Sequence, residues 1–168
     1  TPLPVSVPRP WVMHCCTANA TQGLYYAWEG ALREQGHQAE VNLFLNRTGR
    51  LIDMDSFLPY MGKVVFHIKQ DSTRLAVRIP SWILHEALDI FLQQPGRSEV
   101  MLSPDWIGNR LIFTGLSAGD QLTLTYPLNT QTYTYTTNAH TPFEQAYSLT
   151  CRGSTVVQIT PRDPSELS

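Results

Sequence analysis

The chain has few charged residues and no long hydrophobic run, and these two features argue against a disordered protein and against a membrane-spanning one. Only 15% of its 168 residues are charged and 42% are hydrophobic, which argues against general disorder and fits a strand-rich folded protein. The net charge is −2 and no basic stripe runs along the chain, so we expect no nucleic-acid partner. No apolar run approaches the roughly 20 residues that span a bilayer, so we expect no membrane partner either.

Cysteines are also few. Three cysteines, an odd number, do not support a disulfide framework, and no Cys-x-x-Cys spacing occurs. Two of them, Cys15 and Cys16, are adjacent, and two interpretations of this pair stay open. They are small buried hydrophobic side chains, or they are thiolates used in nucleophilic chemistry or in a soft metal site, most naturally zinc. Zinc needs four ligands, and neither His14 nor Cys151 stands at a spacing that completes the set.

The first ten residues contain four prolines and lack both an initiator methionine and a signal peptide, so we expect the chain to be part of something longer. After them the pattern predicts one helix. Thr17 or Asn19 can cap it, and Gly36 is placed to end it after about Gln35. Its apolar face is too aromatic for solvent, so we expect it to pack against something; this face contains Leu24, Tyr25, Trp28, Ala31 and Leu32.

From there the hydrophobic period changes to two, which predicts strands. Many short strands without intervening helices favour an antiparallel β-sandwich over residues 38–160. The predicted fold is therefore mainly β, with a division into residues 1–36 (proline-rich lead and helix) and 37–168 (β-sandwich domain). The expected strands are 41–45, 51–57, 64–69, 74–79, 88–92, 99–102, 110–113, 121–126, 131–136 and 154–160.

The remaining residues that could carry chemistry fit a structural role better. Asp53 and Asp55 share one strand face, so their carboxylates could suit glycoside hydrolysis, but a solvent-facing strand with protective charges is the favoured interpretation. His67 and the His85-Glu86 pair have no visible nucleophile or metal partner and are interpreted as surface residues. Flat rings on a sandwich can stack on sugars, although core packing is their more frequent use; the candidates are Trp82, Trp106, Tyr133 and Tyr135.

Several motifs together resemble one known family, the β-L-arabinofuranosidases among the glycoside hydrolases. The first is the run from His14 to Ala20, which contains the cysteine pair and is followed by Gly23-Leu24-Tyr25. Val41 to Leu45, Arg78-Ile79-Pro80-Ser81-Trp82 and the Gly119-Asp120 turn leading into Gln121 to Leu124 follow in order. The similarity spans most of residues 11–160. It implies that a catalytic (α/α)6 barrel precedes a β-sandwich, so that the predicted helix is the last one of the barrel.

The resemblance also implies roles for the cysteine pair. In that family a zinc-activated thiolate attacks the anomeric carbon of an arabinofuranoside, and the matching positions make Cys15 the nucleophile and Cys16 a zinc ligand. Zinc lowers the pKa of a thiol, so a thiolate can exist at neutral pH. The family's acid/base glutamate and its other zinc ligands come from the barrel and have no counterpart in this chain.

We therefore expect a C-terminal fragment of a retaining glycoside hydrolase that is inactive alone and self-associates through Tyr25 and Trp28. The alternative is a freestanding β-sandwich module that binds carbohydrate or protein, with the cysteines merely packed.

Overall fold

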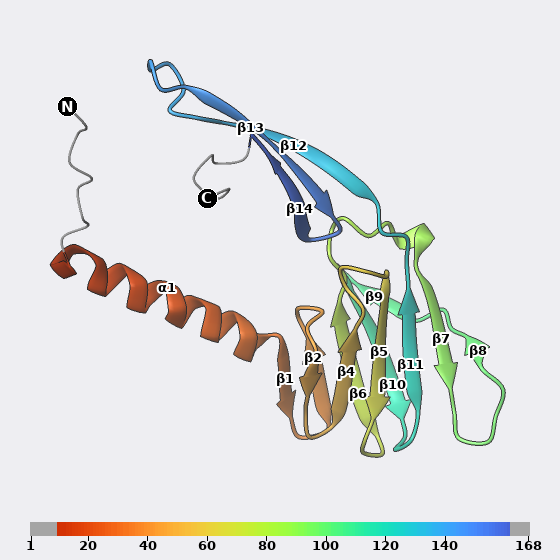
Figure 1. The fold of residues 1–168 in the computed structure, drawn as a ribbon. Helices are drawn as coiled ribbons and strands as arrows, with labels where there is room; N and C mark the ends of the chain where they lie inside the picture. The colour runs from red at the N-terminus through yellow and green to blue at the C-terminus, as the bar shows by residue number, and fades with distance from the viewer. Residues whose placement is uncertain (1–9, 162–168) are drawn as a thin grey trace.

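The computed structural model describes residues 10–161, with side chains from residue 19 onward. One helix, α1 (Pro10–Gly30), precedes fourteen strands and a short 3-10 helix, η1 (His85–Ala87). This confirms the predicted mainly β fold, an antiparallel sandwich preceded by a single helix (Figure 1). Within the described residues, α1 is not apolar enough to cross a bilayer, and no other helix is long enough.

Two of the three sheets form the sandwich. The first contains five strands in the order β1-β2-β6-β10-β9, in which only the pairing of β2 with β6 is parallel. Its strands are β1 (Leu32–Gln35), β2 (Gln38–Val41), β6 (Thr73–Arg78), β10 (Arg110–Leu116) and β9 (Asp105–Ile107).

The second sheet contains six strands in the order β3-β4-β5-β11-β7-β8, and every pairing in it is antiparallel. Its strands are β3 (Arg47–Thr48), β4 (Ile52–Ser56), β5 (Lys63–Ile68), β11 (Gln121–Thr125), β7 (Asp89–Gln93) and β8 (Val100–Met101).

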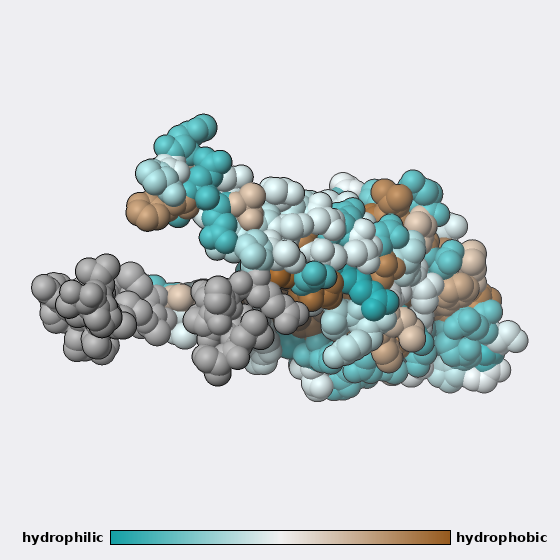
Figure 2. All heavy atoms as spheres, turned by 45° about the horizontal axis from the view of Figure 1, so that its top comes forward, coloured by the Kyte–Doolittle hydropathy of each residue, from teal (hydrophilic) through white to brown (hydrophobic). Residues whose placement is uncertain are grey.

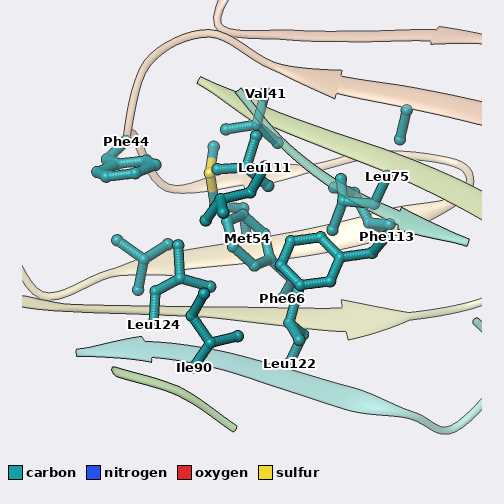
Figure 3. Packing of buried hydrophobic residues seen from close by; sticks show 14 of the residues in the cluster. Val41, Phe44, Met54, Phe66, Leu75, Ile90, Leu111, Phe113, Leu122 and Leu124 are labelled. Atoms are coloured by element: carbon teal, nitrogen blue, oxygen red, sulfur yellow. The ribbon is translucent and has the colours of Figure 1, made fainter. Parts of the chain in front are cut away.

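The core lies between these two sheets. Leu75, Leu111 and Phe113 extend from the five-stranded sheet toward Met54 and Phe66 of the six-stranded sheet (Figure 3). The inward residues of each strand stand two positions apart, and in β4 they alternate with Asp53 and Asp55, which is the pattern of a sheet with one buried face. The inner faces therefore follow from the sequence pattern.

The third sheet projects from the sandwich. It is a three-stranded antiparallel sheet of β12 (Thr130–Thr137), β13 (Gln145–Arg152) and β14 (Thr155–Thr160). Figure 1 shows this sheet and α1 extending from the sandwich toward the same side. The sequence pattern predicts residues 130–160 inside the sandwich. The structure differs because β12 consists of threonine, glutamine and tyrosine, so it has no aliphatic face to bury.

The helix prediction was wrong at both ends. The helix begins at Pro10, ahead of the predicted caps, where proline's fixed φ suits the first helical position and its missing N–H removes no bond. It ends at Gly30, because Leu32 is needed in the core as the first residue of β1. Gly36, expected to stop the helix, has a φ of +57° and forms the turn between β1 and β2.

Most predicted strands are present with slightly different ends. The strand expected at residues 41–45 is instead β2, which ends at Val41. Four strands were missed, and all of them except β13 are short; they are β1, β3, β9 and β13. The division at residues 36 and 37 stays a prediction.

Candidate functional site

The cysteine pair lies within α1, and the side chains of Cys15 and Cys16 fall outside the described part. The helix begins five residues before Cys15, at Pro10, so the pair lies in its second turn. The favourable effect of a helix N-terminus on a thiolate fades within the first turn, so it contributes little to Cys15. The roles of Cys15 as nucleophile and Cys16 as zinc ligand stay predictions.

The end of α1 is fixed to the sandwich by two polar side chains. The Arg47 guanidinium lies 3.7 Å from the centre of the Trp28 ring, and its Nη1 donates to the Trp28 carbonyl oxygen at 3.0 Å. Asn42 Nδ2 donates to the Gly30 carbonyl oxygen at 2.9 Å. The last carbonyls of a helix have no partner within it and carry partial negative charge, so a cation and an amide donor suit this end. These contacts set the direction in which α1 leaves the sandwich.

The apolar face of α1 has no cover within the described residues. Leu24 is 73% exposed and Trp28 51% exposed, although Arg47 lies over one face of the Trp28 ring. Tyr25 contacts the rings of Tyr26 and Trp28 edge-on or tilted, which joins the aromatic side chains into one cluster. Such a cluster fits a surface that another polypeptide covers.

This face leads to a prediction about the oligomeric state. We expect the chain to self-associate through α1, and a Leu24→Ser variant to lower the average mass measured by light scattering at high protein concentration. A Trp28→Ser variant should do the same, with an added loss of the contact between the Arg47 guanidinium and the indole ring. The exposed Glu29→Gln change is the control. Unchanged solubility and mass in both apolar-to-serine variants would contradict self-association through this face.

Asp53 forms a surface ion pair and Asp55 a surface hydrogen bond, each with a side chain that follows or belongs to β5. Asp53 Oδ1 lies 3.1 Å from Lys69 Nζ, and Asp55 Oδ2 lies 3.1 Å from His67 Nε2. All four side chains are partly exposed on the outer face of β4 and β5. The favoured interpretation of a solvent-facing pair with protective charges therefore fits the structure.

The candidate sugar-binding rings fall into two groups. Trp82 packs edge-on against Tyr126, with 5.7 Å between the ring centroids. The His85 ring stacks on one face of Trp106, with 3.8 Å between the ring centroids. Tyr133 and Tyr135 are exposed on β12, two residues apart and so on the same face of the strand. Of these four rings, the two tyrosines keep the freely accessible position that a stacking platform needs.

The described side chains do not complete a zinc site. Among residues 19–161, no three histidine, cysteine or acidic side chains gather as metal ligands would. Cys151 is a free, partly buried thiol on β13. The side chains of residues 19–161 alone therefore do not make up a tetrahedral zinc site.

Sequence reasoning missed the residues that hold α1 in place. Trp28 and Arg47 are 19 residues apart, and Gly30 and Asn42 are 12 apart, so no local spacing joins them. The arginine and asparagine residues that follow the predicted helix are a weak signal, because such side chains are common in surface loops of any fold.

Sequence comparison finds no relative: no family model matches the chain, and no characterised protein matches it significantly. Comparison of folds does find similar structures. One is Ara127N, a GH127 β-L-arabinofuranosidase from Geobacillus stearothermophilus T6, with a TM-score of 0.60, 16% identity, and coverage of 84% of this chain and 23% of that one.

Two further structures agree with it. A second GH127 β-arabinofuranosidase has a TM-score of 0.51 and 15% identity over 75% of this chain and 23% of its own. A protein described as a glycoside hydrolase has a TM-score of 0.57 and 17% identity over 84% of this chain and 24% of its own. This chain thus spans about a quarter of their length and has the fold of that part of these glycoside hydrolases, which confirms the resemblance at the level of fold.

Proposed function

We propose that this chain is the C-terminal portion of a retaining glycoside hydrolase that acts on L-arabinofuranosides, and that it is inactive alone. The observation that carries the proposal is the fold shared with three glycoside hydrolases over most of this chain but about a quarter of theirs. The motifs that suggested the family from sequence, above all the cysteine pair on α1, support it independently.

The arrangement of α1 is consistent with this proposal. The helix extends from the sandwich with an uncovered aromatic face, and its last turn is fixed by Arg47 and Asn42. A single helix cannot enclose a sugar, so the substrate pocket has to come from further helices packed on that face. The proposed pocket therefore includes α1, and its cysteines, as one wall.

Within that pocket Cys15 is the proposed nucleophile. In a retaining reaction the nucleophile forms a covalent glycosyl–enzyme intermediate that water then cleaves, while an acid protonates the departing oxygen. Cys16 is the proposed zinc ligand, and zinc binding would favour the thiolate form of a neighbouring thiol. Because the described side chains complete no metal site, the proposal takes the remaining zinc ligands from outside them, and the resemblance assigns the acid to the preceding barrel.

The test begins with the coding DNA before Thr1. An open frame that supplies a few hundred helical residues supports the proposal, whereas a start codon directly before Thr1 would favour the freestanding binding module. The longer product should hydrolyse a p-nitrophenyl β-L-arabinofuranoside, and the 168-residue chain should not. Cys15→Ala should lower the rate of the longer product by about 1,000-fold or more, because the covalent step is lost.

Cys151→Ala is the matched control, since this third thiol lies on β13 and has no proposed role. The metal assignment has a separate readout. The longer protein, purified without added metal, should contain about one zinc per chain, lost in Cys16→Ser. Full activity of the Cys15→Ala protein would exclude the nucleophile, and equal zinc in the Cys16→Ser protein would exclude the ligand.

A further inference from the structure

A groove near the end of α1, next to Asn42, combines apolar lining residues with one arginine. It is lined by residues 42–45, by Leu58, by Arg78, by residues 80–82 and by Ser154 of the β13–β14 turn. Leu43 and Leu45 on its wall are 39% and 42% exposed, and Figure 2 shows that hydrophobic residues reach the surface of the sandwich in several places. None of its lining residues is acidic, and Arg78 is its one charged residue. The groove therefore offers apolar contact and a positive charge together.

A second arginine stands directly beside Arg78. Arg110 of β10 is the cross-strand partner of Arg78 on β6, so two like charges lie opposite each other on one sheet face. Neither forms an ion pair with any residue from 19 to 161. Like charges directly opposite destabilise a sheet unless something compensates them. An anion that contacts both guanidinium groups would remove this repulsion.

Asn42 links the two arginines to the groove. Arg110 Nη2 donates to Asn42 Oδ1 at 2.7 Å, and Arg78 Nη1 makes a long 3.5 Å contact to the Asn42 carbonyl oxygen. Arg110 Nη1 is buried and lacks a hydrogen-bond partner. A buried donor without an acceptor has lost its hydration and gained nothing in exchange, so this guanidinium is suited to gaining an acceptor.

A second buried polar atom without a partner belongs to a residue that packs against two residues of the groove. This atom is the hydroxyl oxygen of Tyr126. The Tyr126 ring stacks on Phe44, with 6.2 Å between the ring centroids, and meets Trp82 edge-on, with 5.7 Å between the ring centroids. Phe44 and Trp82 both line the groove. Burial raises the pKa of Tyr126, so the hydroxyl stays protonated and remains a donor. The two residues that carry these unsatisfied atoms, Arg110 and Tyr126, therefore both contact residues that line the groove.

We propose that this groove binds a polypeptide segment in which a glutamate or aspartate stands next to an aliphatic side chain. The carboxylate would bridge Arg78 and Arg110, because guanidinium groups match carboxylates with paired, charge-assisted hydrogen bonds. The aliphatic side chain would lie on Leu43 and Leu45. The inference is independent of the proposed function, since it rests only on the contacts of the sandwich.

The test uses two capped peptides that differ in one group, N-acetyl-leucyl-glutamic acid amide and its glutamine counterpart. Each is titrated into the whole chain at constant ionic strength, while NMR follows the arginine Nε–H and tryptophan indole signals. The glutamate peptide should shift the Arg78, Arg110 and Trp82 signals saturably. The glutamine peptide should have a dissociation constant at least about tenfold higher, because it lacks the charge that the guanidinium groups pair with.

Two variants and one further probe complete the test. Arg78→Gln should abolish the preference for the glutamate peptide, whereas Arg97→Gln, on the β7–β8 connection, should leave it unchanged. Equal binding of the two peptides would overturn the proposal. So would sodium acetate that shifts the same signals with the same half-saturation as the glutamate peptide, because the groove would then be a site for any small carboxylate.

Discussion

A Gly62→Ala variant is expected to lose about 3 kcal/mol or more of its free energy of unfolding, among the larger effects that one methyl group can have. A Cβ at Gly62 would lie 1.9 Å from the carbonyl oxygen of Tyr126 and 2.9 Å from its Cδ2. Backbone atoms cannot move aside as the end of a flexible side chain can, so the strands themselves must separate.

The strands that would separate are β5 and β11, which are neighbours in the six-stranded sheet. Tyr126 N donates to the Gly62 carbonyl oxygen at 2.9 Å, which extends the ladder of β5 and β11 by one more pair. Tyr126 also supports Phe44 and Trp82, so the groove beside α1 should be disturbed as well.

Denaturant unfolding followed by tryptophan fluorescence measures this effect. Gly23→Ala is the matched control, because nothing lies within 4 Å of a Cβ at that position. There the change should be neutral or should stabilise α1 by up to about 1 kcal/mol, the helix-propensity difference between glycine and alanine. A Gly62→Ala protein within about 1 kcal/mol of the parent would show that the sheet accommodates the methyl group.

The second large effect is expected at Glu34, where Glu34→Ala should lower the free energy of unfolding by about 3 kcal/mol. Its carboxylate accepts three backbone N–H groups: Oε2 accepts from Arg50 at 2.7 Å, and Oε1 accepts from Leu51 at 2.7 Å and Ile52 at 3.2 Å. Leu51 and Ile52 are fully buried, so their amides would find water only by opening the core.

These bonds join β1 of the first sheet to the start of β4 in the second. Loss of the side chain should therefore loosen the edge of the sandwich where α1 enters it. Amide hydrogen exchange should show faster exchange at residues 50–52 in Glu34→Ala.

Glu34→Gln keeps one acceptor oxygen and should fall between Glu34→Ala and the parent. Glu29→Ala, at an exposed position on α1, is the control and should change stability by less than about 0.5 kcal/mol. Equal stability of the Glu34→Ala and Glu29→Ala proteins would mean that the three amides are satisfied in another way.

Glu34 also shows where sequence reasoning failed. The stretch from Ala31 to Gln35 has good helix formers, and its apolar residues continue the helical spacing of Leu24 and Trp28, so the sequence predicts a longer helix. The same residues alternate as a strand would, with Leu32 and Glu34 facing inward and Arg33 outward. Tertiary contacts decided between the two patterns, because burying Leu32 and pairing Glu34 with three amides outweigh a weak local preference.

By itself the sequence determined the class of fold and most strands, because period-two alternation, as in β4 where buried Ile52 and Met54 alternate with Asp53 and Asp55, indicates which face is buried. Its ordered motifs also suggested the family whose fold the structure shares. Only the tertiary structure decided where α1 ends, how Arg47 and Asn42 hold it, and that Arg78 and Arg110 stand side by side. Those contacts join residues 12 to 32 positions apart, and one sequence carries no signal for pairings that form only when distant strands meet.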